Sequence, residues 1–201
     1  MTGQLPTGRR HLDALHRSLR ALEQDVDRID GFGRAIAHTL LDGGRLLAVG
    51  NGGSAAQAQH LTSELVGRYR DERRPLSALC LSAETSSVTA IANDYGVAEV
   101  FSRQVAAHGR PGDVLVALST SGRSPNIAAA VATGRDVGLF TLALTGSAPN
   151  PVAAASDASV CVPGSTATVQ EVHQVVVHLL CAAVDVEVGA SRDVLDLGVY
   201  G

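Results

Sequence analysis

Five short apolar runs, each bounded by turn residues, constrain the fold of this chain more than any other feature. They cover residues 45–50, 76–81, 113–118, 139–145 and 158–162, and their continuous apolar character predicts strands buried on both faces. Stretches of helical length separate them, such as 54–67 and 126–134. Strand–helix–strand order requires right-handed crossovers and a parallel sheet. The sequence therefore predicts an α/β fold, with a three-layer, doubly wound, five-stranded parallel sheet.

Helices are expected at both ends of this pattern. Apolar residues recur at the spacing of a helix seam through the first 30 residues, so a helix there should pack against a partner, within the subunit or from another one. The seam residues are Leu12, Leu15, Leu19, Leu22, Val26 and Ile29. Further helices are expected over 32–42 and 168–188. We predict a single domain (1–201), with helices for packing and oligomerisation (1–43), an α/β core (44–188) and a short tail (189–201).

Composition narrows the classes of function. The formal net charge is -4, there is no basic block, and three Phe, three Tyr and no Trp leave few rings for stacking on bases, so no nucleic-acid partner is expected. No apolar run approaches the roughly 20 residues that span a bilayer, and residues 1–10 lack the core of a secretory signal. We therefore expect no membrane partner and a cytoplasmic location. The three Cys are expected to be small buried side chains.

A glycine-rich turn follows the first predicted strand and leads straight into a helix. It reads Asn51-Gly52-Gly53-Ser54. Backbone N–H groups and the helix dipole favour an anion at such a position, although the turn could also serve only to reverse the chain. It matches neither G-x-G-x-x-G nor a Walker sequence, which argues against dinucleotides and ATP. Ligands of parallel sheets bind at the carboxyl ends of the strands, so this turn is a candidate phosphate site.

A second candidate loop follows the third predicted strand, where Ser119, Thr120, Ser121 and Ser124 place four hydroxyls in six residues. One hydroxyl could cap the next helix, but four converging donors suit a phosphate monoester. Arg123 could add charge to that site or point into solvent. The two loops together predict a binding site for a phosphorylated small molecule.

His60 and Glu64 stand four residues apart on the helix after the first loop, so both side chains leave one face. Such a pair is compatible with a zinc site and also with an ordinary surface pair. With the two loops, and with Asn93-Asp94-Tyr95-Gly96 and Gln170-Glu171-Val172-His173 plus His178, it completes a set of motifs. In this order, over about residues 44–188, the motifs resemble those of the phosphoheptose isomerase family, within the sugar isomerase (SIS) superfamily.

The resemblance implies the SIS fold, with flavodoxin-like strand order, and a homotetramer with active sites between subunits. It implies interconversion of sedoheptulose 7-phosphate and D-glycero-D-manno-heptose 7-phosphate through an enediol, with one zinc ion per subunit. The implied zinc ligands are His60, Glu64, Gln170 and His178. The implied substrate-binding residues are Asn51, Gly52, Gly53, Ser54, Glu64, Asn93, Asp94, Ser119, Thr120, Ser121, Ser124 and Gln170.

Glu64 is the candidate base of this reaction and His178 the candidate acid, with the metal polarising or orienting the oxygens. A carboxylate bound tightly to zinc is a poorer base. Either Glu64 loosens from the metal when substrate arrives, or the metal is mainly structural. Asn93 and Asp94 are expected in a polar loop, and His173, among valines, is expected to be structural.

The proposed ligand set raises a geometric problem, since eight helical residues would separate Gln170 from His178 by roughly 12 Å and about 80°. Either the helix begins after Gln170, or the ligands approach from different subunits. Periodicity alone would choose Glu171 instead.

Three positions depart from the family. Ala167 and Thr168 replace an acidic residue and an Arg, and Arg123 stands where Asn is usual. The Ala167 and Thr168 departure keeps open an isomerase of another sugar phosphate. Because the superfamily also includes non-enzymatic relatives, a second alternative is a non-catalytic SIS protein that binds a sugar phosphate or a partner of the replication-initiator type.

Overall fold

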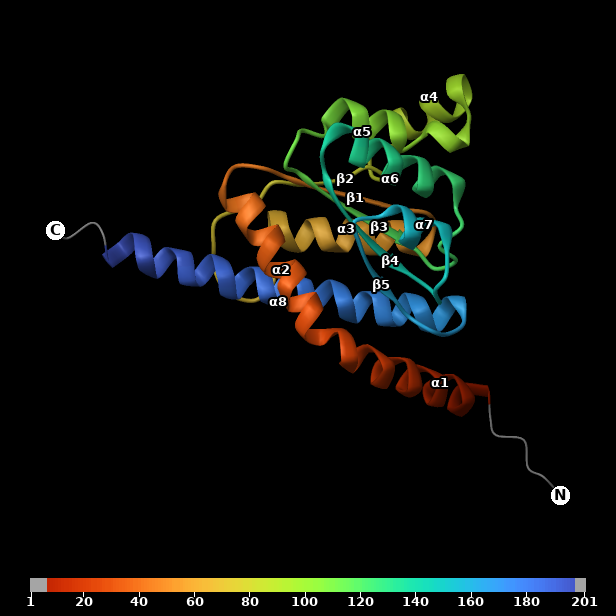
Figure 1. Cartoon of the computed structure of the whole chain (residues 1–201), viewed down its shortest axis with the longest axis horizontal. Coiled ribbons are helices and arrows are strands. Elements are labelled where there is room, and N and C mark those ends of the chain that lie inside the picture. Colours follow the sequence, from red (N-terminus) through yellow and green to blue (C-terminus); the bar gives the residue numbers. More distant parts are fainter. Residues whose placement is uncertain (1–6, 198–201) are drawn as a thin grey trace.

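The computed structural model describes residues 7–197 as a parallel sheet between two layers of helices (Figure 1). The helices are α1 (Thr7–Leu22), α2 (Val26–Leu41), α3 (Gly53–Val66), α4 (Thr85–Tyr95), α5 (Ser102–His108), α6 (Pro125–Val137), α7 (Pro151–Ala155) and α8 (Thr166–Leu197), with 3-10 turns η1 (Glu23–Asp25) and η2 (Val97–Glu99). The strands are β1 (Leu46–Gly50), β2 (Ala78–Cys80), β3 (Val114–Ser119), β4 (Phe140–Thr145) and β5 (Ala158–Cys161).

The strand order is β2-β1-β3-β4-β5, and every pair is parallel. This confirms the predicted α/β class, the five strands and the flavodoxin-like order. Gly50 at the end of β1 pairs with Leu118 near the end of β3. After β1 the chain leads to β2, toward one edge of the sheet, and after β3 it leads to β4, toward the other edge. The loops that follow β1 and β3 therefore form the crevice where a doubly wound sheet binds ligands.

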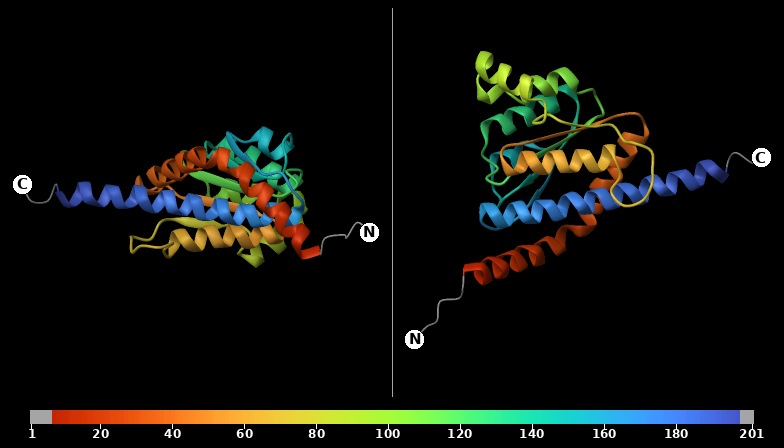
Figure 2. Two further views of the ribbon diagram at one scale, coloured as in Figure 1. Left: turned by 90° about the horizontal axis from the view of Figure 1, so that it is seen from below. Right: turned by 180° about the vertical axis from the view of Figure 1, so that it is seen from behind.

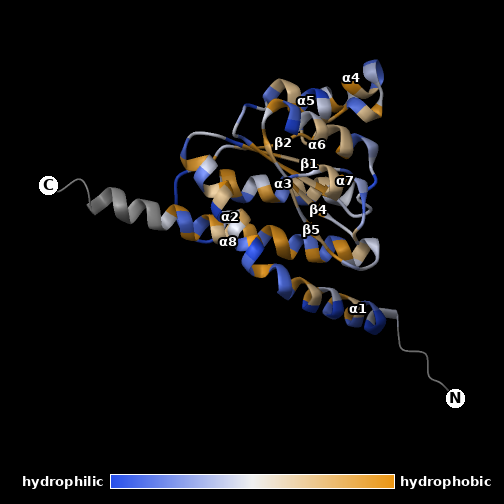
Figure 3. Cartoon of the chain, in the orientation of Figure 1, coloured by the Kyte–Doolittle hydropathy of each residue, from blue (hydrophilic) through white to orange (hydrophobic). Residues whose placement is uncertain are grey.

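Two apolar cores lie on the two faces of the sheet. One contains residues of α2, α3 and α8, including Ile36, Leu61 and Val176. The other contains residues of α5, α6 and α7, including Val105 and Ile127. Apolar residues concentrate in the strands and in the part of α8 that crosses the sheet (Figure 3). The sheet thus holds α3 and α8 side by side on one face, and these helices carry most of the predicted site.

Helix α8 is longer than expected. It begins at Thr166 and continues through Leu197, so it covers both the predicted final helix and most of the predicted tail; residues 198–201 lie outside the described part of the chain. Among the helices of residues 7–197, it alone is long and apolar enough to cross a membrane by length and composition, over Thr166–Gly189. No span of this length was expected. Val172, Val176 and Leu180 are buried against the rest of the protein, as in a core helix.

The N-terminal helices also differ from the expectation. The boundary between them lies at η1, not near residue 31. Leu22 and Ile29 are buried, whereas Leu12 remains 54% exposed. Helix α1 and the C-terminal part of α8 project from opposite sides of the α/β core (Figure 2).

Candidate functional site

A small cavity of about 60 Å³ lies between the loops that follow β1 and β3. Its walls are Asn51, Ser54, Leu118, Ser119, Thr120, Ser124 and Gln170. The space is about twice the volume of one water molecule in the liquid, which suits a phosphate group better than a whole sugar. The structure therefore brings both predicted phosphate loops together and adds Gln170 from α8.

Helices α3 and α6 both begin at this cavity. The residues that precede their first turns, Gly52 and Ser124, make no side-chain capping hydrogen bond. The first N–H groups of both helices and the positive ends of both dipoles are thus directed to one place. The alternative that a serine hydroxyl only caps α6 finds no support, since the Ser124 hydroxyl lies 3.3 Å from that of Ser119.

Two glycines give the loops their shape. A Cβ on Gly53 would come within 2.5 Å of the Gln170 side-chain nitrogen, so only glycine lets this amide lie against the start of α3. Gly122 has a φ of 61°, and a Cβ there would come within 2.0 Å of Asn150 Oδ1. The close approach of a neighbouring side chain therefore explains why glycine stands at both positions.

The predicted polar residues of the loops have unequal roles. Ser54 and Ser119 are buried in the cavity wall, whereas Ser121 is exposed and accepts a hydrogen bond from the Arg123 backbone N–H at 3.2 Å. The Arg123 side chain is exposed. Ser121 thus shapes the turn within this subunit.

The Asn51 side chain exchanges two hydrogen bonds of 2.9 Å with Asn126, a buried residue of α6. Sequence reasoning missed Asn126. Its partner is 75 residues away, and the pairing becomes visible only when β1 and β3 are known to be neighbours.

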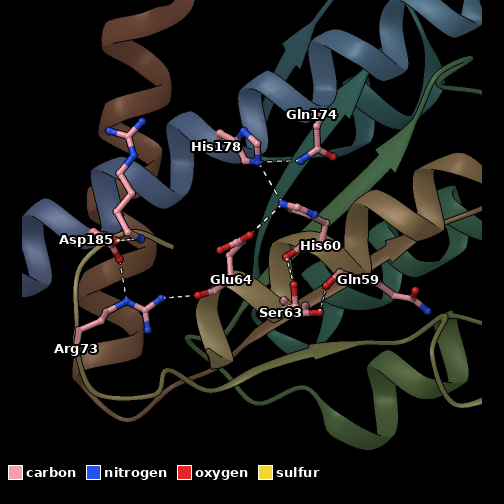
Figure 4. Close-up of polar contacts among 10 residues, drawn as sticks. Gln59, His60, Ser63, Glu64, Arg73, Gln174, His178 and Asp185 are labelled. Carbon is pink, nitrogen blue, oxygen red and sulfur yellow. Dashed lines mark hydrogen bonds and ion pairs between the residues drawn. The ribbon is translucent and has the colours of Figure 1, made fainter. Parts of the chain in front are cut away.

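A second cluster lies further along α3 and α8 and unites the predicted base and acid (Figure 4). His60 Nε2 is 3.1 Å from Glu64 Oε1 and 3.1 Å from His178 Nε2. The Tyr69 ring lies against His178, with ring centroids 5.5 Å apart. Three of the four predicted zinc-binding side chains therefore converge within one subunit.

The fourth, Gln170, lies at the phosphate cavity. Helix α8 is regular from Thr166, so the alternative in which it begins after Gln170 is wrong. The amide that contacts this cluster belongs to Gln174, whose Nε2 is 3.1 Å from His178 Nε2. Ligands from different subunits remain a prediction. Among the side chains that the structure describes, those of residues 7–189, no three His, Cys, Asp or Glu form a ready-made metal site.

Arg73 fixes the end of α3 to α8 beside this cluster. Its guanidinium donates to the backbone oxygen of Glu64 at 2.6 Å and to Asp185 Oδ1 at 2.8 Å, and both Arg73 and Asp185 are almost fully buried as side chains. Cys181 lies nearby, and burial, with the charges of Glu64 and Asp185, raises the pKa of its thiol to about 12. Its thiol is therefore protonated at neutral pH, which fits the expected structural role.

Asn93 and Asp94 were expected in a polar loop but form the last turn of α4, where they are exposed and bonded to each other at 2.7 Å. Neither lines the phosphate cavity. Thr168, at a position that departs from the family, is fully buried, and its hydroxyl lies 3.0 Å from that of Ser165.

The prediction that His173 is structural is confirmed. The ring is fully buried, and its Nε2 donates to the Thr145 carbonyl at 3.1 Å. Burial lowers the pKa of His173 from 6.5 to about 4, against the smaller opposing effect of that hydrogen bond.

Comparison with known proteins agrees with this arrangement. The sequence pattern of the SIS domain matches residues 10–146. A phosphoheptose isomerase of Streptomyces coelicolor is 60% identical over 176 residues, which cover 87% of this chain and 76% of that protein. One of Thiobacillus denitrificans is 47% identical over 180 residues, covering 87% of this chain and 91% of that protein.

Solved structures lead to the same family. The phosphoheptose isomerase GmhA of Neisseria gonorrhoeae has a TM-score of 0.79 at 38% identity, covering 88% of this chain and 95% of that one. A phosphoheptose isomerase of Francisella tularensis has a TM-score of 0.78 at 33% identity, covering 88% of this chain and 93% of that one. The chain belongs to the phosphoheptose isomerase family of SIS-domain enzymes.

Proposed function

We propose that the protein interconverts sedoheptulose 7-phosphate and D-glycero-D-manno-heptose 7-phosphate. One observation carries this: α3 and α8 each contribute to both the phosphate cavity and the His60, Glu64 and His178 cluster. Six residues of α3 separate Ser54 from His60, a rise of roughly 9 Å. A heptose 7-phosphate carries its phosphate at one end and the reacting C1 and C2 at the other. The two parts of the site are therefore spaced for a seven-carbon chain.

The reaction needs one group for the carbon-bound proton and one for the oxygens. From the ketose, Glu64 removes a proton from C1 while His178 supplies one to the C2 oxygen, which gives the enediol. Return of the first proton to C2 and loss of the proton on the C1 oxygen give the aldose. The 3.1 Å contacts from His60 to Glu64 and to His178 hold these two groups near each other.

We include one zinc ion per subunit in the proposal, bound by His60, Glu64 and His178. Two imidazole nitrogens and a carboxylate oxygen are ligands that zinc favours. Ligand atoms about 2.1 Å from a tetrahedral ion lie about 3.4 Å apart, and the two separations of 3.1 Å that join His60 to Glu64 and to His178 are slightly shorter. The ion would act as a Lewis acid toward the substrate oxygens. Glu64 would leave the ion when substrate arrives, so that its carboxylate is free to take the proton, and His178 would bind through Nε2 and donate its proton from Nδ1. Gln170 as a further ligand, from this or another subunit, stays a prediction.

A homotetramer in the cytoplasm completes the proposal. The projecting parts of α1 and α8 carry exposed apolar side chains, with Leu12 54% and Val186 72% exposed. Burial of these side chains between copies would stabilise an assembly. Light scattering of the purified protein tests this, and a stable monomer would contradict it.

The test of function is turnover of sedoheptulose 7-phosphate by the zinc-loaded protein, followed by detection of the aldose. Glu64→Gln and His178→Ala should each lower kcat by at least about 100-fold. An inert wild type would overturn the proposed reaction, whereas activity with fructose 6-phosphate but not the heptulose would favour another sugar phosphate. Activity of both variants within a few fold of wild type would overturn the assignment of base and acid.

A further inference from the structure

We propose that Asn150 is a positioning residue for phosphate binding, because its side chain holds the loop after β3 (residues 119–124) in the shape that lines the cavity. This inference deepens the proposed function, since it concerns the phosphate end of that site. Asn150 stands in the turn between β4 and α7, and β4 is a neighbour of β3 in the sheet (Figure 1). Asn150 does not line the cavity, so it acts through the residues that it touches.

The Asn150 side chain is held in place at both ends of its amide. Only 5% of the residue is exposed. Its Nδ2 donates to Thr145 Oγ1 at 3.0 Å and to the Ser147 carbonyl at 3.3 Å, which uses both of its protons. Its Oδ1 accepts a hydrogen bond from the Ala153 N–H at 2.9 Å. The amide therefore has a single orientation and offers its neighbours a rigid surface.

Three contacts join the turn that carries Asn150 to the loop after β3. Gly122 packs directly on the amide, since a Cβ on Gly122 would collide with Asn150 Oδ1. The Val152 N–H donates to the Gly122 carbonyl at 3.0 Å. A Cβ on Gly146 would likewise collide with the Thr120 carbonyl oxygen, so the two backbones touch there too. The loop is therefore fixed to the turn at two of its residues.

The loop held in this way supplies one wall of the phosphate cavity. Ser119, Thr120 and Ser124 line the cavity, and the Gly122 N–H closes the loop by donating to the Ser119 carbonyl at 3.0 Å. Ser119 is itself the last residue of β3, so a shift of Gly122 would move the later residues relative to it. Hydrogen bonds to phosphate oxygens weaken steeply when distances and angles depart from their optimum. Asn150 should therefore control the affinity for phosphate.

A purely structural role is the alternative, because Asn150 also caps the first turn of α7. The cap needs only the oxygen that accepts from the Ala153 N–H, and a serine hydroxyl does this equally well at such a position. Serine is shorter and lacks the two N–H donors, so it loses the contacts with Thr145 and Gly122. Asn150→Ser thus separates the cap from the positioning of the loop.

The test measures the affinity of the full chain for inorganic phosphate by isothermal titration calorimetry, together with the kinetics of sedoheptulose 7-phosphate turnover. Asn150→Ala and Asn150→Ser should each raise the Kd for phosphate and the KM at least about fivefold. The kcat should stay within about threefold of wild type, because the His60, Glu64 and His178 cluster lies further along α3 and α8. Circular dichroism and urea unfolding verify that each variant is folded under the assay conditions.

Glu84→Ala is the matched control. Glu84 is exposed and caps α4 through the Ser86 and Ser87 N–H groups, as Asn150 caps α7. Its loss should shift the urea midpoint downward and leave the Kd for phosphate within about twofold of wild type.

A Kd for phosphate within about twofold of wild type in Asn150→Ala would overturn the positioning role. Recovery of the wild-type Kd in Asn150→Ser would also overturn it, because the cap alone would then suffice. A wild type that binds no phosphate would overturn it as well. A wild type that binds phosphate but leaves the heptulose phosphate unchanged would overturn the proposed reaction instead, and the phosphate affinities of the variants would still decide the role of Asn150.

Discussion

Asn51 and Asn126 join the two phosphate loops through a reciprocal pair of side-chain hydrogen bonds, each 2.9 Å long. One residue follows β1, and the other lies in the first turn of α6 after β3. Each amide uses one donor and one acceptor on the other, so the pair fixes the spacing of the helix N-termini that line the cavity.

Asn126→Ala should therefore weaken substrate binding more than it slows the chemical step. Loss of a buried amide partner leaves the Asn51 groups unpaired, which costs about 1–3 kcal/mol of stability. We expect KM to rise several-fold with a smaller fall in kcat, measured by steady-state kinetics and urea unfolding. Gln24→Ala, at an exposed amide in η1, should change neither. A large fall in kcat at constant KM would contradict this role.

Gly122→Ala should disrupt the serine loop. The added Cβ would lie within 2.0 Å of Asn150 Oδ1, and the φ of 61° is unfavourable for alanine. Together these should cost at least about 2 kcal/mol in urea unfolding and lower the affinity for inorganic phosphate. Gly31→Ala is the contrasting variant. Its Cβ would meet one Arg34 atom, at 3.9 Å, within α2, so stability should hold or rise. Equal stability of the two variants would contradict the steric argument.

The sheet was predictable because its strands are buried on both faces and read as continuous apolar runs. The expected run 45–50 became Leu46–Gly50, and 139–145 became Phe140–Thr145. Helix α4 was missed because it has no fully buried residue and therefore no apolar period. Its first turn is capped instead by the Glu84 carboxylate, which accepts hydrogen bonds from the Ser86 and Ser87 N–H groups.

The site was predictable in its parts but not in its contacts. Loop composition indicated phosphate, and His60 and Glu64 were placed on one helix face by spacing. The joining of His60 to His178 spans 118 residues and came from the family resemblance. Gln174 and Asn126 were missed because no local pattern distinguishes a contacting amide from a surface one.

The pH dependence of stability should show the burial of His173. Its ring stays neutral in the folded protein down to about pH 4, whereas the unfolded chain takes up a proton below about pH 6.5. The unfolded state binds more protons between these values, so this contribution is complete above pH 6.5 and is lost as the pH falls toward 4.

Between pH 7 and 5 the loss from this group should be roughly 2 kcal/mol. Urea unfolding of His173→Gln should remove most of that difference, because the amide does not titrate. His16→Gln, at an exposed histidine of α1, should retain it. The same pH dependence in wild type and His173→Gln would show that other groups dominate.

Asp185→Asn should show how Arg73 positions the catalytic cluster. Arg73 donates to both Asp185 and the backbone of Glu64, so loss of the charge on Asp185 loosens the end of α3 that carries the proposed base. Breaking a buried ion pair lowers the free energy of unfolding by about 3–5 kcal/mol. We expect no more than this for Asp185→Asn, because the amide keeps one oxygen that can accept a hydrogen bond from Arg73. We expect kcat to fall more than KM rises, because the phosphate cavity lies at the other end of α3.

The exposed pair between Arg28 and Asp25 provides the contrast to this buried one. The Arg28 side chain is 52% exposed, and surface pairs contribute at most about 1 kcal/mol. Asp25→Asn should therefore leave both stability and kcat close to wild type. If Asp185→Asn lowered stability but left kcat unchanged at a temperature where it is fully folded, Arg73 would hold the fold together without positioning Glu64.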